Sequence, residues 1–161
     1  MNLGLTFRNA DESDTKLILK FIKDLAAYEK MSDEVFATEE LLYEWLFVKQ
    51  KAEVIFAVKD DIEIGFALFF YNISTFLGKA GIYIEDLFVL PEYRGKGYGK
   101  QILKYLSRLA AERGCGRLEW SCLDWNKPSI DFYLSLGAKP MSDWTVYRLS
   151  GETLQNLADS D

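Results

Sequence analysis

The sequence predicts an α/β fold: one domain over residues 1–161, with a mixed, mostly antiparallel sheet flanked by helices. Three observations predict it. A length of 161 residues suits one domain with its own core. The hydrophobic period switches repeatedly between that of a helix and that of a strand. No repeat, low-complexity tract or linker divides the chain.

The first third of the chain is mostly helical. A short strand is expected at residues 5–8, before an amphipathic helix that Asp11–Asp14 caps and that ends near Tyr28. Thr38 can cap a second helix, which carries Leu41, Leu42, Trp45 and Leu46. The acidic segment between these helices is either a plain surface loop or a rim over a binding site.

The middle of the chain has the period of strands. Three consecutive strands, at residues 54–58, 62–71 and 80–90, are expected to form an antiparallel meander that Pro91 ends. A helix over residues 98–111 follows, and then a strand at 117–122. Because a helix separates this strand from the one before it, the two should be parallel, with a right-handed crossover.

The remaining residues are expected to form a short helix at 130–136 and then a strand pair, or one bent strand, at 138–149. A tail from Gly151 could add a helical turn.

Composition limits the function. The net charge of −6 argues against a nucleic-acid partner and favours a small cationic substrate. The chain has no His and only Cys115 and Cys122, too few soft ligands for a zinc site, so no metal is expected. It shows no signal-peptide pattern and no apolar run long enough for a membrane span. We therefore expect a cytoplasmic protein with reduced thiols and no membrane partner.

A glycine-rich junction between strand and helix indicates a phosphate site. Gly95, Gly97 and Gly99 remove every second Cβ, so backbone N–H groups can converge on an anion at the start of the following helix. The spacing matches neither a dinucleotide fingerprint nor a Walker A loop. The simpler alternative is a flexible turn without a ligand.

The pattern Arg94-x-x-Gly97-x-Gly99 resembles the pyrophosphate loop of the GCN5-related N-acetyltransferases. Three further stretches, residues 27–31, 83–89 and 125–133, are similar to the diamine acetyltransferases that act on spermidine, spermine or thialysine. The resemblance covers nearly the whole chain. It implies an acetyltransferase fold, acetyl-CoA as co-substrate, a primary amine of a small polyamine-like or lysine-like molecule as acceptor, and a homodimer.

The same resemblance assigns roles to single residues. Tyr133 matches the family's proton donor. Tyr28, Glu29 and Glu85 match its amine-side positions. The positions that match its coenzyme contacts are Leu87, Phe88, Val89, Arg94, Gly95, Lys96, Gly97, Tyr98, Gly99, Lys100, Asn126, Pro128, Ser129 and again Tyr133.

The proton transfers of amine acetylation explain why carboxylates and a phenol would be needed. An alkylammonium must lose its proton before it attacks a thioester, and Glu85, in an otherwise apolar strand, is expected to be a buried carboxylate that accepts it. Glu29, and in a weaker reading Asp86, would hold the cation. One of the two adjacent carboxylates could instead lie on the solvent face, because neighbouring strand residues alternate. Tyr133 could protonate the leaving thiolate or could be a plain core aromatic.

Two other functions stay open. The acceptor could be a protein lysine or N-terminus, which would need an open groove on the acceptor side. Alternatively, the glycine loop could serve a non-catalytic coenzyme A binding module. The absence of any Cys–His or Ser–His arrangement favours direct transfer in a ternary complex over an acyl-enzyme.

Overall fold

The computed structural model describes residues 4–161 and contains two compact units, Met1–Leu123 and Asp124–Asp161, which are treated separately below. In the described residues, no helix is both long enough and apolar enough to cross a membrane.

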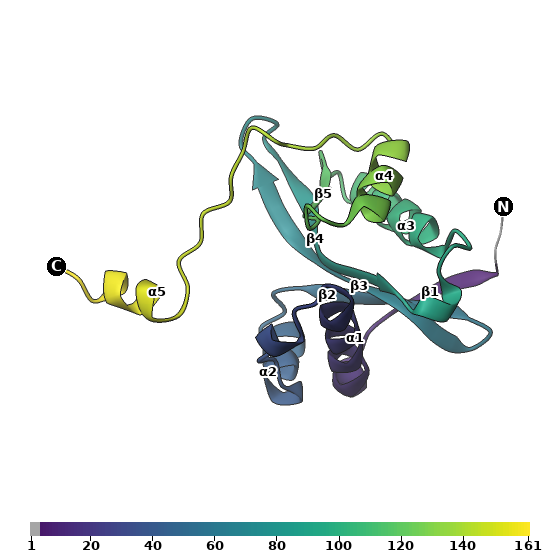
Figure 1. The fold of residues 1–161 in the computed structure, drawn as a ribbon, viewed down its shortest axis with the longest axis horizontal. Coiled ribbons are helices and arrows are strands. Elements are labelled where there is room, and N and C mark those ends of the chain that lie inside the picture. Colours follow the sequence, from purple (N-terminus) through teal and green to yellow (C-terminus); the bar gives the residue numbers. More distant parts are fainter. Residues whose placement is uncertain (1–3) are drawn as a thin grey trace. The chain divides into compact units, whose positions relative to one another are not determined.

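The first unit is built on a five-stranded sheet in the order β1-β2-β3-β4-β5 (Figure 1). The strands are β1 (Leu5–Asn9), β2 (Glu53–Lys59), β3 (Ile62–Ser74), β4 (Lys79–Val89) and β5 (Leu118–Trp120). The first four pair antiparallel and β5 pairs parallel with β4. The predicted fold class, meander and parallel crossover strand are therefore confirmed. β5 is shorter than the predicted strand at residues 117–122.

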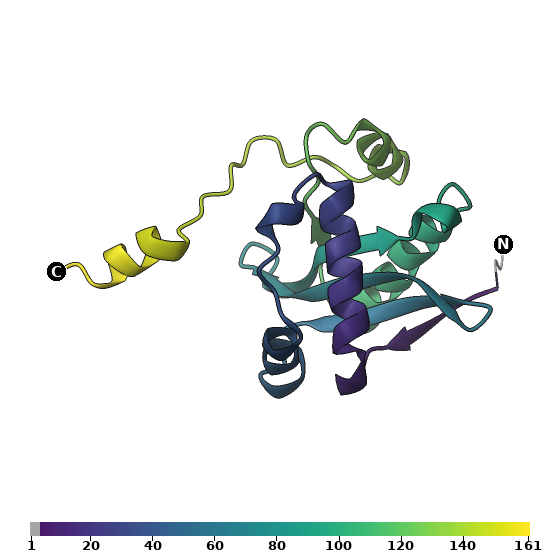
Figure 2. The same ribbon diagram turned by 60° about the horizontal axis from the view of Figure 1, so that its bottom comes forward.

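Helices cover both faces of this sheet. On one face lie α1 (Thr15–Tyr28), α2 (Glu39–Tyr43) and a π-helical turn (Glu44–Val48), and on the other lies α3 (Tyr98–Glu112) (Figures 1 and 2). Short 3-10 turns occupy Glu12–Asp14, Ser32–Glu34 and Pro91–Tyr93. As predicted, the Thr38 side chain caps α2 by accepting a hydrogen bond from the Leu41 amide, 3.1 Å long.

The two faces have separate apolar cores. Under α1, the ring of Phe21 stacks on Phe66 at 5.2 Å between centroids and meets the edge of Phe88 at 6.2 Å. On the opposite face, Phe69, which follows Leu68 of the α1 core, and Ile82 are 1% and 0% exposed. This alternation is why β2, β3 and β4 read as nearly continuous apolar runs: helices cover both of their faces.

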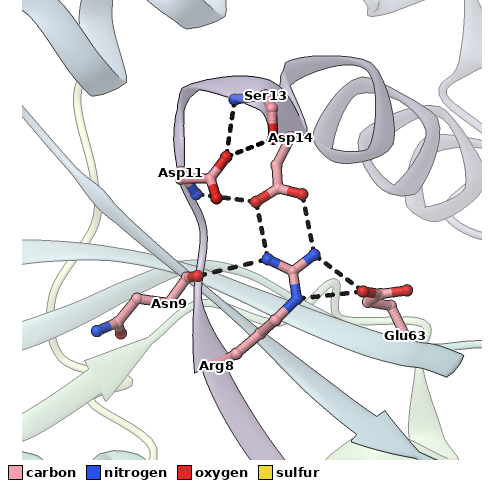
Figure 3. A network of polar contacts seen from close by, with 6 residues as sticks. All are labelled: Arg8, Asn9, Asp11, Ser13, Asp14 and Glu63. Atoms are coloured by element: carbon pink, nitrogen blue, oxygen red, sulfur yellow. Dashed lines mark hydrogen bonds and ion pairs between the residues drawn. The ribbon is translucent and has the colours of Figure 1, made fainter. Parts of the chain in front are cut away.

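An ion-pair network fastens α1 to the sheet (Figure 3). Arg8 of β1 donates two hydrogen bonds to Asp14, at 2.8 and 2.9 Å, and two to Glu63 of β3, at 3.1 and 2.9 Å. Asp14 also accepts the Asp11 amide at 2.8 Å and completes a capping box with that residue. The hydrogen bonds from Arg8 are the main reason that the pKa of Asp14 lies below its ordinary value.

The second unit has two helices and no strand. Its helices are α4 (Lys127–Ser135) and α5 (Gly151–Ala158), which confirm the predicted short helix and the helical tail. The predicted strand at residues 138–149 is wrong: no residue in this range belongs to a strand. Side chains typical of strands, such as Trp144, Val146 and Tyr147, are 74%, 82% and 92% exposed. Local propensity favours an extended backbone, but a strand also needs a hydrogen-bonding neighbour, which propensity does not supply.

Candidate active site

A β-bulge interrupts β4 at the acidic pair. Leu68 of β3 pairs with Asp86, and the next residue, Phe69, pairs with Ile84, so Glu85 is an extra residue without a partner in β3. The bulge removes the strict alternation of faces along this stretch. Even so, the two adjacent carboxylates differ in exposure, as the alternative reading expected.

The bulge decides which carboxylate is buried, and it is not the one expected. Glu85 is exposed and Asp86 is partly buried. Directly paired residues share a face, and Leu68 belongs to the core under α1, so Asp86 lies on the α1 face of the sheet. The expectation of a buried Glu85 was wrong because the sequence shows two adjacent acids but not the register that separates their environments.

Three carboxylates are grouped at this point. Burial, and then the negative charges of Glu85 and Glu29, raise the pKa of Asp86 to about 6. Burial also raises the pKa of Glu29, the residue that follows α1. The three acids come from the end of α1 and the middle of β4. Such a group favours a cation, because each carboxylate is more stable in its ionised form beside a positive charge.

Beyond the bulge, β4 has an open edge. β5 pairs only with Ile82, Tyr83 and Ile84, so within residues 4–161 no strand pairs with the other edge of β4 at 85–89. The predicted pantetheine contacts, Leu87 to Val89, lie on this stretch. Backbone N–H and C=O groups that face this edge could bind an extended amide-containing ligand as an added strand would.

The glycine loop follows directly. Gly95 and Gly97 have φ of 74° and 88°, as their predicted role requires, and Gly97 immediately precedes α3. Gly99 differs from the expectation: it lies in the first turn of α3 without positive φ. A Cβ built on Gly95 or Gly99 would meet no atom within 4 Å. The helix start is therefore open, and its amides can bind a diphosphate.

The other residues expected in the loop divide between surface and core. Lys96 and Lys100 are exposed, whereas Tyr98 is buried with 8% of its surface exposed. Arg94 is exposed, and its guanidinium lies 4.6 Å from the ring centroid of Tyr28, the last residue of α1. Tyr28, which is 38% exposed, thus contacts the loop through Arg94 and directly precedes Glu29 in the chain.

The remaining predicted residues belong to the second unit. Asn126, which is buried, immediately precedes α4, and Pro128 and Ser129 lie in its first turn. Tyr133 lies in the middle of α4, partly buried, with its ring 5.5 Å from that of Phe132. The start of α4 and the Tyr133 side chain thus belong to one short helix. Their participation in one site with the first unit stays a prediction.

Comparison with known proteins assigns the family. The model of the Acetyltransferase (GNAT) family matches residues 19–138, which include the acidic strand, the glycine loop and α4. The chain belongs to the GNAT acetyltransferase family. It is an N-acetyltransferase.

Similar proteins narrow the comparison. The chain is 37% identical to a thialysine N-epsilon-acetyltransferase of Bos taurus, over 94% of this chain and 95% of that protein. It is 34% identical to a human spermidine/spermine N(1)-acetyltransferase-like protein, over 94% of this chain but 23% of that longer protein. Among solved structures, an integron cassette protein of V. cholerae superposes with a TM-score of 0.81 at 30% identity and covers 98% of this chain.

From the sequence, Asp86 was expected to matter less than Glu85 on the amine side of the site. Its signal was present, since two adjacent acids in an apolar strand cannot both lie on the solvent face when the faces alternate. Only the bulge shows which of them is buried. In residues 4–161 no three metal-ligating side chains are grouped so that they could hold an ion.

Proposed function

We propose that this acetyltransferase transfers the acetyl group of acetyl-CoA to a primary amine of a small cationic molecule, of the thialysine, lysine or polyamine class. The observation that carries this proposal is the partly buried carboxyl group of Asp86, on which the negative charges of Glu85 and Glu29 act. A small diamine presents a reacting nitrogen and a second cationic group, and three acids can serve both. The names of the relatives that align over most of this chain support the same acceptor class.

For the coenzyme, we propose three contact regions. The open edge of β4 at Leu87, Phe88 and Val89 would hold the pantetheine arm, and the backbone of residues 94–100 would bind the pyrophosphate. The charges of Lys96 and Lys100 favour the anion. Asn126, Pro128 and Ser129 would line the coenzyme further along.

Asp86 is the best proton acceptor of the three acids in this scheme. Moving a proton from an alkylammonium, with a pKa of about 10.4, to an ordinary aspartate costs about 9 kcal/mol. A pKa of about 6 for Asp86 reduces this cost to about 6 kcal/mol. Glu29 and the exposed Glu85 would then hold the positive charge of the substrate. Glu85 retains the alternative role of proton acceptor through water.

The acyl transfer itself balances without an acyl-enzyme. The neutral amine nitrogen attacks the thioester carbonyl carbon, the new C–N bond forms, and the C–S bond breaks. Tyr133 donates its phenolic proton as charge develops on the departing sulfur, and the phenolate regains the proton that the attacking nitrogen loses as the amide forms, directly or through solvent. The backbone N–H at the end of β4, near Val89, is the proposed donor to the carbonyl oxygen.

The proposal also includes an oligomeric state and a cellular location. A homodimer follows from the family resemblance of the sequence. A cytoplasmic location fits Cys115 and Cys122, which are not joined by a disulfide in the described residues.

An acceptor screen tests the proposal. The purified protein is incubated with acetyl-CoA and, separately, with thialysine, lysine, ornithine, putrescine, spermidine and a lysine-containing peptide, and products are weighed by mass spectrometry. The expected result is one added acetyl group on at least one free amine and little on the peptide. Acetylation of the peptide alone would replace the small-molecule acceptor by a protein, and no acetylation of any acceptor would remove the enzymatic proposal.

A further inference from the structure

Arg94 joins the coenzyme loop to the amine side through three contacts. Its guanidinium lies 4.6 Å from the ring centroid of Tyr28 and 4.9 Å from that of Phe88. Its Nε donates a hydrogen bond of 2.8 Å to the backbone carbonyl of Val89. One side chain therefore contacts the end of α1, the core under α1 and the last residue of β4.

Its neighbour in the loop is different. Lys96 carries the same charge, but its Nζ donates to the Glu92 carbonyl at 3.2 Å and lies 5.6 Å from the ring of Tyr93. Both contacts stay within four residues in the chain. Lys96 therefore offers a matched comparison: a cation of the same loop whose contacts are with Glu92 and Tyr93 instead of α1.

The contact between Arg94 and Tyr28 is one of the guanidinium over the aromatic ring. Glu29 follows Tyr28 directly in sequence, and burial raises its pKa. A planar guanidinium stacks on an aromatic face, and this attraction depends on how both groups are placed. An ordered loop thus restricts the Tyr28 ring, and with it the backbone that carries Glu29.

We propose that Arg94 is a positioning residue that couples coenzyme binding to amine binding. This inference rests on the proposed function, because it assumes that residues 94–100 bind the coenzyme and that Tyr28 and Glu29 bind the amine. Coenzyme binding fixes the loop backbone, Arg94 then holds Tyr28, and the amine meets a site that is already ordered. By linkage, the amine must tighten coenzyme binding by the same factor.

Calorimetry with coenzyme A and thialysine measures this coupling without turnover. Thialysine should bind the wild-type protein about five-fold more tightly when coenzyme A is saturating. In Arg94→Gln the ratio should fall to about one. In Lys96→Gln it should stay near five, although coenzyme A itself binds less tightly. Tyr28→Leu should also give a ratio of about one, and Arg94→Gln should add nothing to the loss in Tyr28→Leu.

The conservative variant separates charge from stacking. Arg94→Lys keeps the charge but lacks the planar fork, so its ratio should resemble that of Arg94→Gln. Equal ratios in wild type and Arg94→Gln would overturn the inference, as would a loss of coupling in Lys96→Gln equal to that in Arg94→Gln. In either case Arg94 would be a coenzyme ligand or a surface cation only.

Amide hydrogen exchange tests the link from Arg94 to α1 without any amine substrate, so its outcome does not depend on the proposed acceptor. The amides of Lys30 and Met31 donate to the carbonyls of Ala27 and Ala26 at the end of α1. Saturating coenzyme A should slow their exchange at least three-fold in wild type and Lys96→Gln but not in Arg94→Gln. If the acceptor screen fails and this pattern appears, Arg94 still transmits coenzyme binding to the end of α1, and only the proposed acceptor is wrong. If coenzyme A binds and wild-type exchange does not change, the inference is wrong, whatever the screen shows.

Discussion

Replacing Asp86 by Asn should stabilise the protein at neutral pH while it lowers activity. The pKa of Asp86 is raised to about 6 by burial and by the charges of Glu85 and Glu29. Because the folded pKa exceeds the unfolded one, the native state binds this proton more tightly. Stability therefore falls as the pH rises from about 4 to about 6, and the full cost applies above pH 6. Two pKa units correspond to about 3 kcal/mol.

Urea unfolding followed by tryptophan fluorescence at pH 4 and pH 8 measures this effect. Asp86→Asn should match wild type at pH 4 and exceed it by about 2–3 kcal/mol at pH 8, equivalent to about 5–10 °C in Tm. The control Glu85→Gln changes an exposed acid and should gain less than half as much. Acetyl transfer by Asp86→Asn should fall at least 100-fold. Equal or lower stability than wild type at pH 8 would refute the argument that Asp86 is held ionised at a cost.

Three further outcomes are expected. In Gly65→Ala, the new Cβ would lie 2.6 Å from the Phe88 carbonyl oxygen, so β4 must shift. Calorimetry should then show weaker acetyl-CoA binding, and thermal unfolding should show a loss of stability of about 1–3 kcal/mol. Asp14→Asn should cost about 1–2 kcal/mol at pH 7, because Arg8 lowers the pKa of Asp14. Since this contribution is lost as the pH falls through the lowered pKa, the difference from wild type in urea titrations should shrink steadily as the pH is lowered below about 4. Tyr133→Phe should lower kcat at least ten-fold with little change in acetyl-CoA affinity, and an unchanged kcat would exclude this phenol as the acid.

Much of the fold could be read from local patterns. The meander, the parallel crossover strand and the capped helices were predicted correctly because period, turn residues and caps act over a few residues. The glycine loop was likewise local: φ values at Gly95 and Gly97 follow from the absence of a Cβ. The family resemblance rested on such contiguous stretches.

The failures share a different cause. Residues 138–149 have the composition of a strand, yet no strand partner is present within the described residues. Asp86, not Glu85, is the partly buried acid because a bulge against β3 fixes their environments. In both cases the deciding information is a pairing between segments that are distant in sequence.

Sequence by itself determined the order of the elements as far as α4, the glycine loop and the family. Only the tertiary structure decided which carboxylate has a raised pKa and that Arg94 reaches Tyr28. The physical reason is that propensity and glycine geometry belong to a residue and its neighbours in the chain. Burial, strand register and cation–π contact exist only between residues that folding brings together.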